Sequence, residues 1–276
     1  IVYLILNGGT SDYDGLQAQF QRRLSRGLQA LASYTWAHSI DTGSAASYAV
    51  PSNVFAPSSA AGSNRGPSAF DIRHTFSAAL TYDIPRPNIN ALLDRVLRGW
   101  SLQNIVQARS APPVDVLDGV YQFSYLDGFN APVRPDLVPG VALYLYGSQY
   151  PGGKAINPVA FAHPPIDPTI QQPLRNGDLP RNYFRGFGAV QWDFAIHRSF
   201  PIHESLALQF RAEMFNVLNH PSFGPPSNTF GVAGFGLSNQ ILSQSLNGSN
   251  LGGGAFSPLY QIGGPRSIQL ALKLEF

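Results

Sequence analysis

The chain has 276 residues, of which 44% are hydrophobic and only 12% are charged, and its formal net charge is +2. Typical soluble domains carry about 25% charged residues, so something other than charge must cover the outer faces of this protein. The small net charge argues against a nucleic-acid partner, and the absence of Cys excludes a disulfide framework, a thiolate metal site and a cysteine nucleophile.

Membrane-spanning helices are not predicted anywhere in the chain. Such a helix needs roughly 18–20 apolar residues, and the longest apolar run is residues 1–6. That run is too short, and it lacks the basic start and the small-residue cleavage site of a signal peptide. Because it opens the chain without an initiator Met, we expect residues 1–6 to be the end of a strand and the chain to be the C-terminal piece of a longer polypeptide.

Seven stretches alternate apolar and polar residues with a period of two, which predicts strands that are apolar on one face only. We expect strands of about nine to eleven residues, the length that a tilted strand needs to cross a bilayer. The fourth stretch is irregular, because Asn104 falls on its apolar face and Ile105 on its polar face. The alternation is clearest in residues 16–21, 28–36, 75–82, 100–108, 190–197, 206–214 and 268–276.

The connections between these stretches alternate between short and long. Residues 24–27 and 199–204 are brief turns, and residues 84–99 are an intermediate one in which residues 92–98 are expected to form a short helix. The long connections are rich in Gly, Pro, Ser and Asn and lack obvious secondary structure; they lie at about residues 37–72, 110–188 and 217–265. Outer-membrane barrels have short periplasmic turns and long extracellular loops. With that assignment the last strand runs toward the periplasm.

The terminal stretch alternates up to a final aromatic residue. Terminal residues of soluble domains usually fray into water, whereas the last strand of a membrane barrel must close the sheet and face lipid. We therefore expect Phe276 to lie in the interfacial aromatic girdle at the periplasmic rim. The residues expected to face lipid and to form the membrane assembly signal are Ile268, Leu270, Leu272, Leu274 and Phe276.

Catalytic, cofactor and metal sites are not indicated by any motif. No two of the six His residues have the spacing of a zinc metalloprotease, the Gly-rich segments lack the features of a phosphate loop, and no Ser lies in a nucleophile elbow. We expect no enzyme activity, no catalytic residue, no cofactor and no metal ion. Asp193, Arg211 and Glu213 lie on polar strand faces, and we expect them to pair across the sheet rather than bind a substrate.

The long middle loop carries several aromatic residues among prolines and small residues. Aromatic side chains on loops held by a rigid scaffold are candidate ligand contacts, although they can equally pack the loop against itself. The candidate ligand-binding residues are Tyr121, Phe123, Tyr125, Tyr144 and Tyr146.

A set of short motifs occurs in one order along nearly the whole chain. They include Tyr13-Asp14-Gly15-Leu16-Gln17, Ser33-Tyr34-Thr35-Trp36-Ala37-His38-Ser39, Asp71-Ile72-Arg73-His74, Gly99-Trp100, Arg211-Ala212-Glu213-Met214-Phe215-Asn216 and the terminal Phe276. As a set they resemble the C-terminal barrel of TonB-dependent receptors, in particular the Oar-like proteins. Leu274 departs from the aromatic residue that many outer-membrane proteins carry at this position.

The resemblance implies a receptor in the outer membrane of a Gram-negative-type bacterium that takes up a nutrient by energy-coupled transport. It implies a barrel of about twenty-two strands closed around an N-terminal plug, of which this chain is the final third. The implied partners are outer-membrane lipid, the barrel-assembly machinery, the missing plug and, through the plug, the TonB energising complex. The sequence does not identify the ligand.

The sequence therefore predicts an all-β fold: an antiparallel up-and-down transmembrane β-barrel, present as a C-terminal fragment of seven or eight strands with long extracellular loops. Two alternatives remain open. The first is a passive porin or an adhesion barrel, because eight strands can close by themselves. The second is a secreted β-sandwich that binds carbohydrate, whose strands would also alternate.

Overall fold

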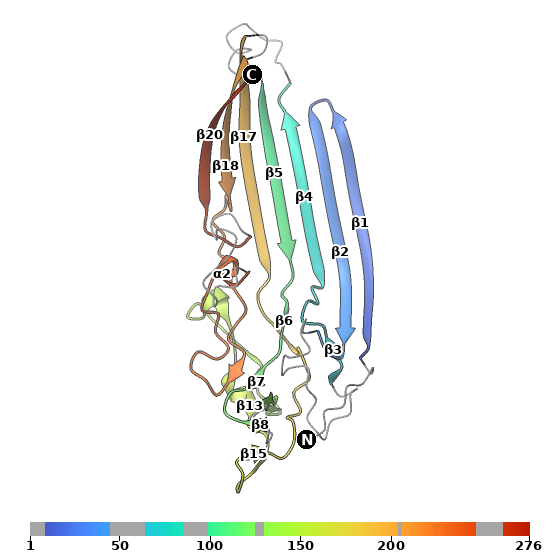
Figure 1. The fold of residues 1–276 in the computed structure, drawn as a ribbon, viewed down its shortest axis with the longest axis vertical. Helices are drawn as coiled ribbons and strands as arrows, with labels where there is room; N and C mark the ends of the chain where they lie inside the picture. The colour runs from blue at the N-terminus through green and yellow to red at the C-terminus, as the bar shows by residue number, and fades with distance from the viewer. Residues whose placement is uncertain (1–8, 45–63, 86–98, 125–129, 204–205, 247–261) are drawn as a thin grey trace.

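Long antiparallel strands form one sheet in the computed structural model, with short strands and loops gathered at one end of it (Figure 1). The structure describes residues 9–44, 64–85, 99–124, 130–203, 206–246 and 262–276. The strand expected at residues 1–6, the helix expected at residues 92–98 and the candidate ligand residue Tyr125 lie outside these ranges.

Seven long strands follow one another across the sheet in chain order, each antiparallel to its neighbours. They are β1 (Ser11–Ser25), β2 (Leu28–Asp41), β4 (His74–Asp83), β5 (Trp100–Arg109), β17 (Ala189–His203), β18 (Leu206–Phe215) and β20 (Ser267–Glu275). A two-residue strand, β3 (Gly66–Pro67), pairs with the end of β2. The prediction of an antiparallel up-and-down sheet is confirmed. Within the described residues β1 and β20 each pair on one side only, so the barrel is not closed.

The register aligns residues of one kind across the sheet. One row of neighbours consists of Ser33, Ser77, Gln107 and Gln191. The row one residue further along β2 consists of Tyr34, Phe76, Ala108 and Val190. Because successive side chains of a strand point to opposite faces, the first row belongs to what we call the polar face and the second to the apolar face.

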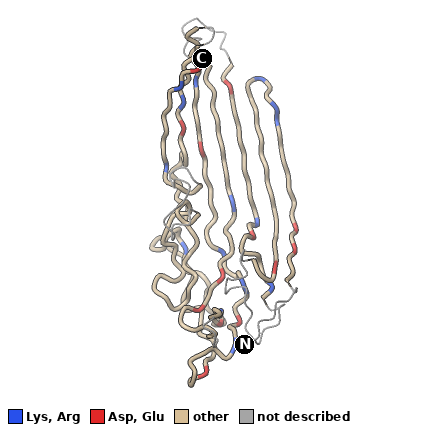
Figure 2. The backbone as a smooth tube through the Cα atoms, in the orientation of Figure 1, with Lys and Arg blue, Asp and Glu red and all other residues tan. Residues whose placement is uncertain are grey.

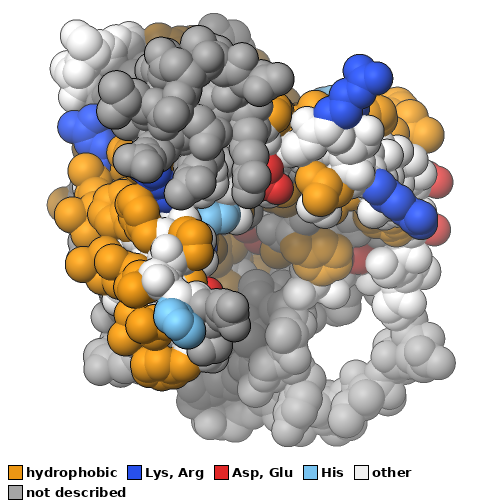
Figure 3. Space-filling view, turned by 90° about the horizontal axis from the view of Figure 1, so that it is seen from above, with side chains coloured by type: hydrophobic (Ala, Val, Ile, Leu, Met, Phe, Trp, Pro, Cys, Tyr) orange, Lys and Arg blue, Asp and Glu red, His pale blue; other side chains and the backbone are white. Residues whose placement is uncertain are grey.

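The apolar face remains exposed to its surroundings. Leu272 on β20 is 71% exposed, and Leu16, Phe20 and Trp36 on the first hairpin are each more than half exposed. An end-on view shows hydrophobic side chains along one outer margin (Figure 3). Charged residues are sparse along the middle of the strands (Figure 2). A soluble protein would cover such a surface with a second layer.

Three strands are longer than expected. β1 and β17 have 15 residues each and β2 has 14. Residues 37–41, expected to open a loop, continue β2 because they keep pairing with β1. Residues 199–203, expected in a turn, lie in β17 and pair with the start of β18 through a register shift between Pro201 and His203. A paired ribbon satisfies its own backbone groups and can therefore extend beyond the bilayer.

The irregular fourth stretch forms an unbroken strand. Asn104 lies on the apolar face between Leu80 and Phe194, and Ile105 lies on the polar face between Ala79 and Asp193. No bulge corrects the pattern there. Instead, the indole N–H of Trp192 donates a hydrogen bond to Asn104 Oδ1 at 3.1 Å. That contact gives the amide oxygen a hydrogen-bond partner on the apolar face.

The turn between β1 and β2 requires a glycine. Arg26 and Gly27 have φ angles of 52° and 79°, as in the tight turns favoured by twisted hairpins. A Cβ on Gly27 would lie 2.3 Å from the carbonyl oxygen of Asp83. Asp83 N also donates to Gly27 O at 2.7 Å. The hairpin tip is therefore packed directly against the end of β4.

The long connections after β5 and β18 contain short strands, although no secondary structure was expected in them. We call residues 110–124, 130–188 and 217–246 the loop cap. Its strands are β6 (Pro113–Val114), β7 (Leu117–Asp118), β8 (Gln122–Ser124), β9 (Asn130–Pro132), β10 (Asp136–Leu137), β11 (Tyr144–Tyr146), β12 (Lys154–Ile156), β13 (Phe161–Ala162), β14 (Ile166–Asp167), β15 (Gln172–Pro173), β16 (Phe184–Arg185) and β19 (Thr229–Phe230). Its helical turns are η3 (Pro151–Gly153), η4 (Pro158–Ala160) and α2 (Leu242–Leu246).

The loop cap has its own hydrophobic core. Phe184, fully buried, packs with ring centroids 5.4 Å from Phe161 and 5.5 Å from Tyr144. Phe230 and Phe235 from the connection after β18 reach the same cluster. Fully burying one such side chain contributes about 1.5–3 kcal/mol, so these rings hold the two long connections together. The cap is a folded unit rather than a set of free loops.

Candidate functional site

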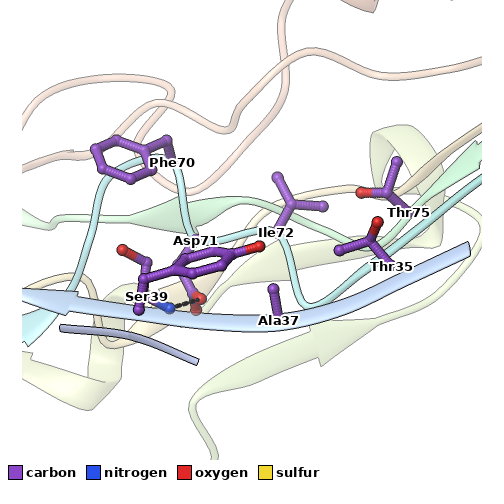
Figure 4. Close-up of a pocket in the computed structure, with 8 residues that line it drawn as sticks. Thr35, Ala37, Ser39, Phe70, Asp71, Ile72 and Thr75 are labelled. Carbon is purple, nitrogen blue, oxygen red and sulfur yellow. Dashed lines mark hydrogen bonds between the residues drawn. The ribbon is translucent and has the colours of Figure 1, made fainter. Parts of the chain in front are cut away.

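A pocket of about 230 Å³ lies on the polar face where β1, β2 and β4 meet the loop before β4. Thr35 and Thr75 are direct neighbours across β2 and β4 and lie at one end of the pocket, while the Phe70 ring lies at the other (Figure 4). The remaining lining residues are Tyr13, Ala37, Ser39, Asp71 and Ile72. The pocket thus combines hydroxyl groups and aromatic rings at the loop end of the sheet.

Asp71, at the floor of this pocket, is 1% exposed and joins three segments of the chain. Its Oδ1 accepts a hydrogen bond from Ser39 N at 2.8 Å and lies 3.1 Å from His38 Nδ1. Its Oδ2 accepts from Arg73 Nε at 3.2 Å and from Arg185 Nη2 at 2.6 Å. Arg185 Nη1 also donates to the backbone oxygen of Asp71 at 2.7 Å. One carboxylate therefore ties the loop cap to β2.

The environment of Asp71 favours its charged form. Burial alone raises the pKa of the carboxyl group, but hydrogen bonds from Arg185, Ser39 and His38, together with the charge of Arg185, outweigh burial and place the pKa below its ordinary value of 3.8. Asp71 is thus ionised at neutral pH and fully engaged by its partners. It acts as a structural anchor rather than as an acid or base.

Two further buried arginines repeat this arrangement. Arg181 donates to the carboxylate and to the backbone oxygen of Asp41, at the end of β2. Arg134 binds Asp115 through Nε at 2.9 Å and Asn64 through Nη2 at 2.9 Å. Both guanidiniums are less than a tenth exposed. No sequence motif indicated these pairs, because their members are separated by 19 to 140 residues.

Two of the candidate ligand aromatics lie together in the structure: the rings of Tyr144 and Tyr146, both on β11, have centroids 6.2 Å apart. Tyr121 and Phe123 are half-buried, and the Tyr121 ring meets His163 edge-on at 5.1 Å. Tyr144 packs against the cap core, and its hydroxyl accepts a hydrogen bond from Arg185 N at 2.8 Å. Tyr146, 71% exposed, is free to contact a ligand. Ligand binding by these residues stays a prediction.

The charged residues on the polar face pair differently from the expectation. Arg211 Nη2 lies 2.6 Å from Glu213 Oε1 along the same strand, not across the sheet. Asp193 accepts hydrogen bonds from Gln191 Nε2 at 2.8 Å and from Asn216 N at 2.8 Å. Residues two apart share a face of one strand, which gives Arg211 a nearer carboxylate than any across the sheet.

The terminal strand presents the expected residues on the apolar face. Ile268, Leu270, Leu272 and Leu274 pair with the apolar positions of β18, and none of them is buried. Phe276 lies just beyond β20 at the end of the sheet that carries the short turns (Figure 1). Recognition of this strand by an assembly factor stays a prediction.

Other kinds of site are not found in the described part of the chain. It contains no group of three or more His, Asp or Glu side chains arranged to hold a metal ion. No helix within it has the length and the hydropathy to cross a membrane.

A family model described as an outer membrane beta barrel domain matches residues 2–262, nearly the whole chain. The chain belongs to this family. Neither a curated protein nor a solved structure matches it. In an outer membrane beta barrel domain the apolar face contacts lipid and the polar face lines the lumen. The pocket and Asp71 therefore lie on the lumen side of the barrel wall, at the end where the loops gather.

Proposed function

We propose that this outer-membrane barrel protein is the C-terminal part of a TonB-dependent receptor of a Gram-negative-type bacterium, which takes up a nutrient ligand by energy-coupled transport. The ligand is captured by the loop cap and the lumen wall. The plug, the TonB complex that acts through it and the barrel-assembly machinery are the protein partners, and outer-membrane lipid surrounds the barrel. We assign it no catalytic step.

The observation that carries the proposal is the open sheet. β1 and β20 each pair on one side only in the part of the chain that the structure describes. In lipid an unpaired backbone group costs several kcal/mol, so each edge must pair, either with the other edge or with further strands. A barrel larger than seven strands, with an interior wide enough for a plug, meets that need.

The loop cap supports capture of a ligand from outside. Its core and its ion pairs to Asp41 and Asp71 hold the cap in one position above the lumen. A preformed surface binds with a smaller entropic cost than a mobile loop. A passive pore, by contrast, has no need for a folded cap at its entrance.

Conductance across planar bilayers tests the proposal against a passive porin. The full-length protein is purified from outer membranes and inserted into the bilayer, and single-channel current is recorded. A plugged receptor stays closed, and removal of the plug opens a large, steady conductance. An intact protein that conducts steadily at once would overturn the proposal in favour of a porin. Recovery in the soluble fraction without detergent would overturn the membrane assignment itself.

A further inference from the structure

Arg109, at the end of β5, lies on the polar face and is half-buried. Its neighbours across the sheet are Thr75 and Ala189, and the next row contains only Ser33, Ser77, Gln107, Gln191 and Gln19. Arg109 is therefore the single charge in two rows of neutral side chains.

No carboxylate compensates this charge among the described residues. Two carboxylates at the loop end of the sheet have other partners. Asp71 binds Arg73 and Arg185, and Asp41 binds Arg181. The Nε atom of Arg109 is shielded from solvent and has no hydrogen-bond partner in the described part of the chain, whereas its terminal nitrogens are not shielded in this way. A half-buried guanidinium without a counterion is costly. An external anion would relieve that cost.

The pocket described above adjoins Arg109. Thr75 lines the pocket and is also the direct neighbour of Arg109 across the sheet, and such neighbours have Cβ atoms about 4.5–5.5 Å apart. The pocket provides hydroxyl groups and the Phe70 ring for the body of a ligand (Figure 4). Arg109 lies beside the threonine end, in reach of a group that projects from the pocket.

The local charge balance also favours an anion. Asp71 is the one carboxylate among the lining residues, and it is already bound by Arg73 and Arg185, while Arg109 adjoins the pocket through Thr75. A guanidinium binds carboxylate and phosphate oxygens through two parallel hydrogen bonds. We propose that Arg109 and the adjoining pocket bind a small hydroxylated ligand that carries a carboxylate or phosphate group. This inference rests on the proposed function, because it names the chemical class of the receptor's ligand.

Three sugars with the same pyranose ring and different groups at C6 test the inference. Titration calorimetry of the full-length protein in detergent at low ionic strength compares glucose, glucuronate and glucose 6-phosphate. At least one of the anions is expected to bind about ten-fold more tightly than glucose, or better, and which one does so distinguishes carboxylate from phosphate. Equal binding of all three, or no binding, would overturn the inference and leave Arg109 to an internal partner.

Variants test whether Arg109 is the residue that causes the preference for the anionic sugar. Arg109→Gln should remove the preference for the anion, and Arg109→Lys should keep part of it, because lysine retains the charge but not the paired hydrogen bonds. Arg266→Gln, which removes an exposed arginine beside β20, should leave the preference unchanged. A preference that survives in Arg109→Gln would contradict the inference. Circular dichroism checks that each variant is folded.

The two proposals fail in different ways. The calorimetric measurement needs neither an energy source nor TonB. A protein that prefers the anion but conducts as an open pore would keep the anion site and lose the receptor function. A protein that does not conduct while intact but binds glucose and the two anions equally would keep the receptor function and lose the anion site.

Discussion

Arg185 and Asp71 are 114 positions apart in the chain, yet Arg185 Nη2 donates to Asp71 Oδ2 across 2.6 Å at the junction of the loop cap and the sheet. The carboxylate is almost fully buried, and the guanidinium also binds the backbone of Asp71. This pair therefore helps to hold the loop cap against the sheet, together with the pair between Arg181 and Asp41.

Replacing Arg185 by Ala is expected to loosen the cap. The change removes two charge-assisted hydrogen bonds to a buried residue, at a cost of about 3 kcal/mol. Limited proteolysis of the folded protein should then cut the cap faster than in the wild type. The control is Arg175→Ala, which breaks an exposed pair with Asp136 and should cost at most about 1 kcal/mol. Equal cleavage rates in both variants would contradict the anchoring role.

Acidification is expected to release the same junction. Because the folded pKa of Asp71 lies below its ordinary value of 3.8, its contribution to stability is fully present above 3.8 and is lost as the pH falls through the folded pKa. Cap cleavage by an acid protease should rise only below about pH 4. In Asp71→Asn the cap should already be loose at neutral pH and should respond less to acid. An identical acid response in both proteins would assign the effect to another carboxylate.

The tip of the first hairpin should not tolerate a side chain. Gly27→Ala combines strain at a φ of 79° with a Cβ 2.3 Å from Asp83 O, so we expect a loss of about 2–4 kcal/mol in the free energy of unfolding. Gly140→Ala is a matched control, because Gly140 has a φ of 78° and open space around its Cβ position. It should cost about 1 kcal/mol. Denaturant titration of the refolded barrel measures both values.

Tyr144 and Tyr146 lie on the same short strand, β11, but differ in their expected contribution to stability. Tyr144→Phe leaves the N–H of Arg185 without its acceptor and should lower the free energy of unfolding by about 1–2 kcal/mol. Tyr146→Phe should change stability by less than about 0.5 kcal/mol, because the residue is exposed. A stability loss in the second variant but not in the first would reverse the roles assigned here.

A charge on the apolar face should block assembly. Leu272→Arg would place a guanidinium near the middle of β20, where lipid contact costs about 2–4 kcal/mol. Gln269→Arg, on the polar face opposite Glu213, should be accepted. The folded fraction of each variant in outer membranes, read from heat-dependent gel mobility, checks this. Normal assembly of Leu272→Arg would indicate that water or protein, not lipid, covers this face.

The sheet could be predicted from the sequence because it depends on the alternation of polar and apolar residues within each strand. Ser33 next to Tyr34, and Ser77 next to Phe76, already show which face meets water and which meets lipid. Asn104 interrupts this local pattern, because it is a polar residue on the apolar face. Its hydrogen-bond donor is the indole N–H of Trp192, 88 positions away in the chain. A contact at that separation leaves no periodic signal.

The loop cap could not be predicted for the same reason. Each of its described strands is two or three residues long, too short for any period to appear. Phe161, Phe184 and Phe230 form its core from three separate segments. The anchors Asp41 and Asp71 lie in or beside motifs that carried the family resemblance, but their arginine partners lie far along the chain.

Arg181 and Arg185 lie four residues apart, and they bind carboxylates at two different places earlier in the chain: Asp41 at the end of β2 and Asp71 in the segment before β4. The middle connection thus supplies the arginines, and the end of β2 and the segment before β4 supply the carboxylates that pair with them. Grafting one of them alone into a related barrel would leave buried charges without counterions. Engineering of the loop cap should therefore exchange both segments together.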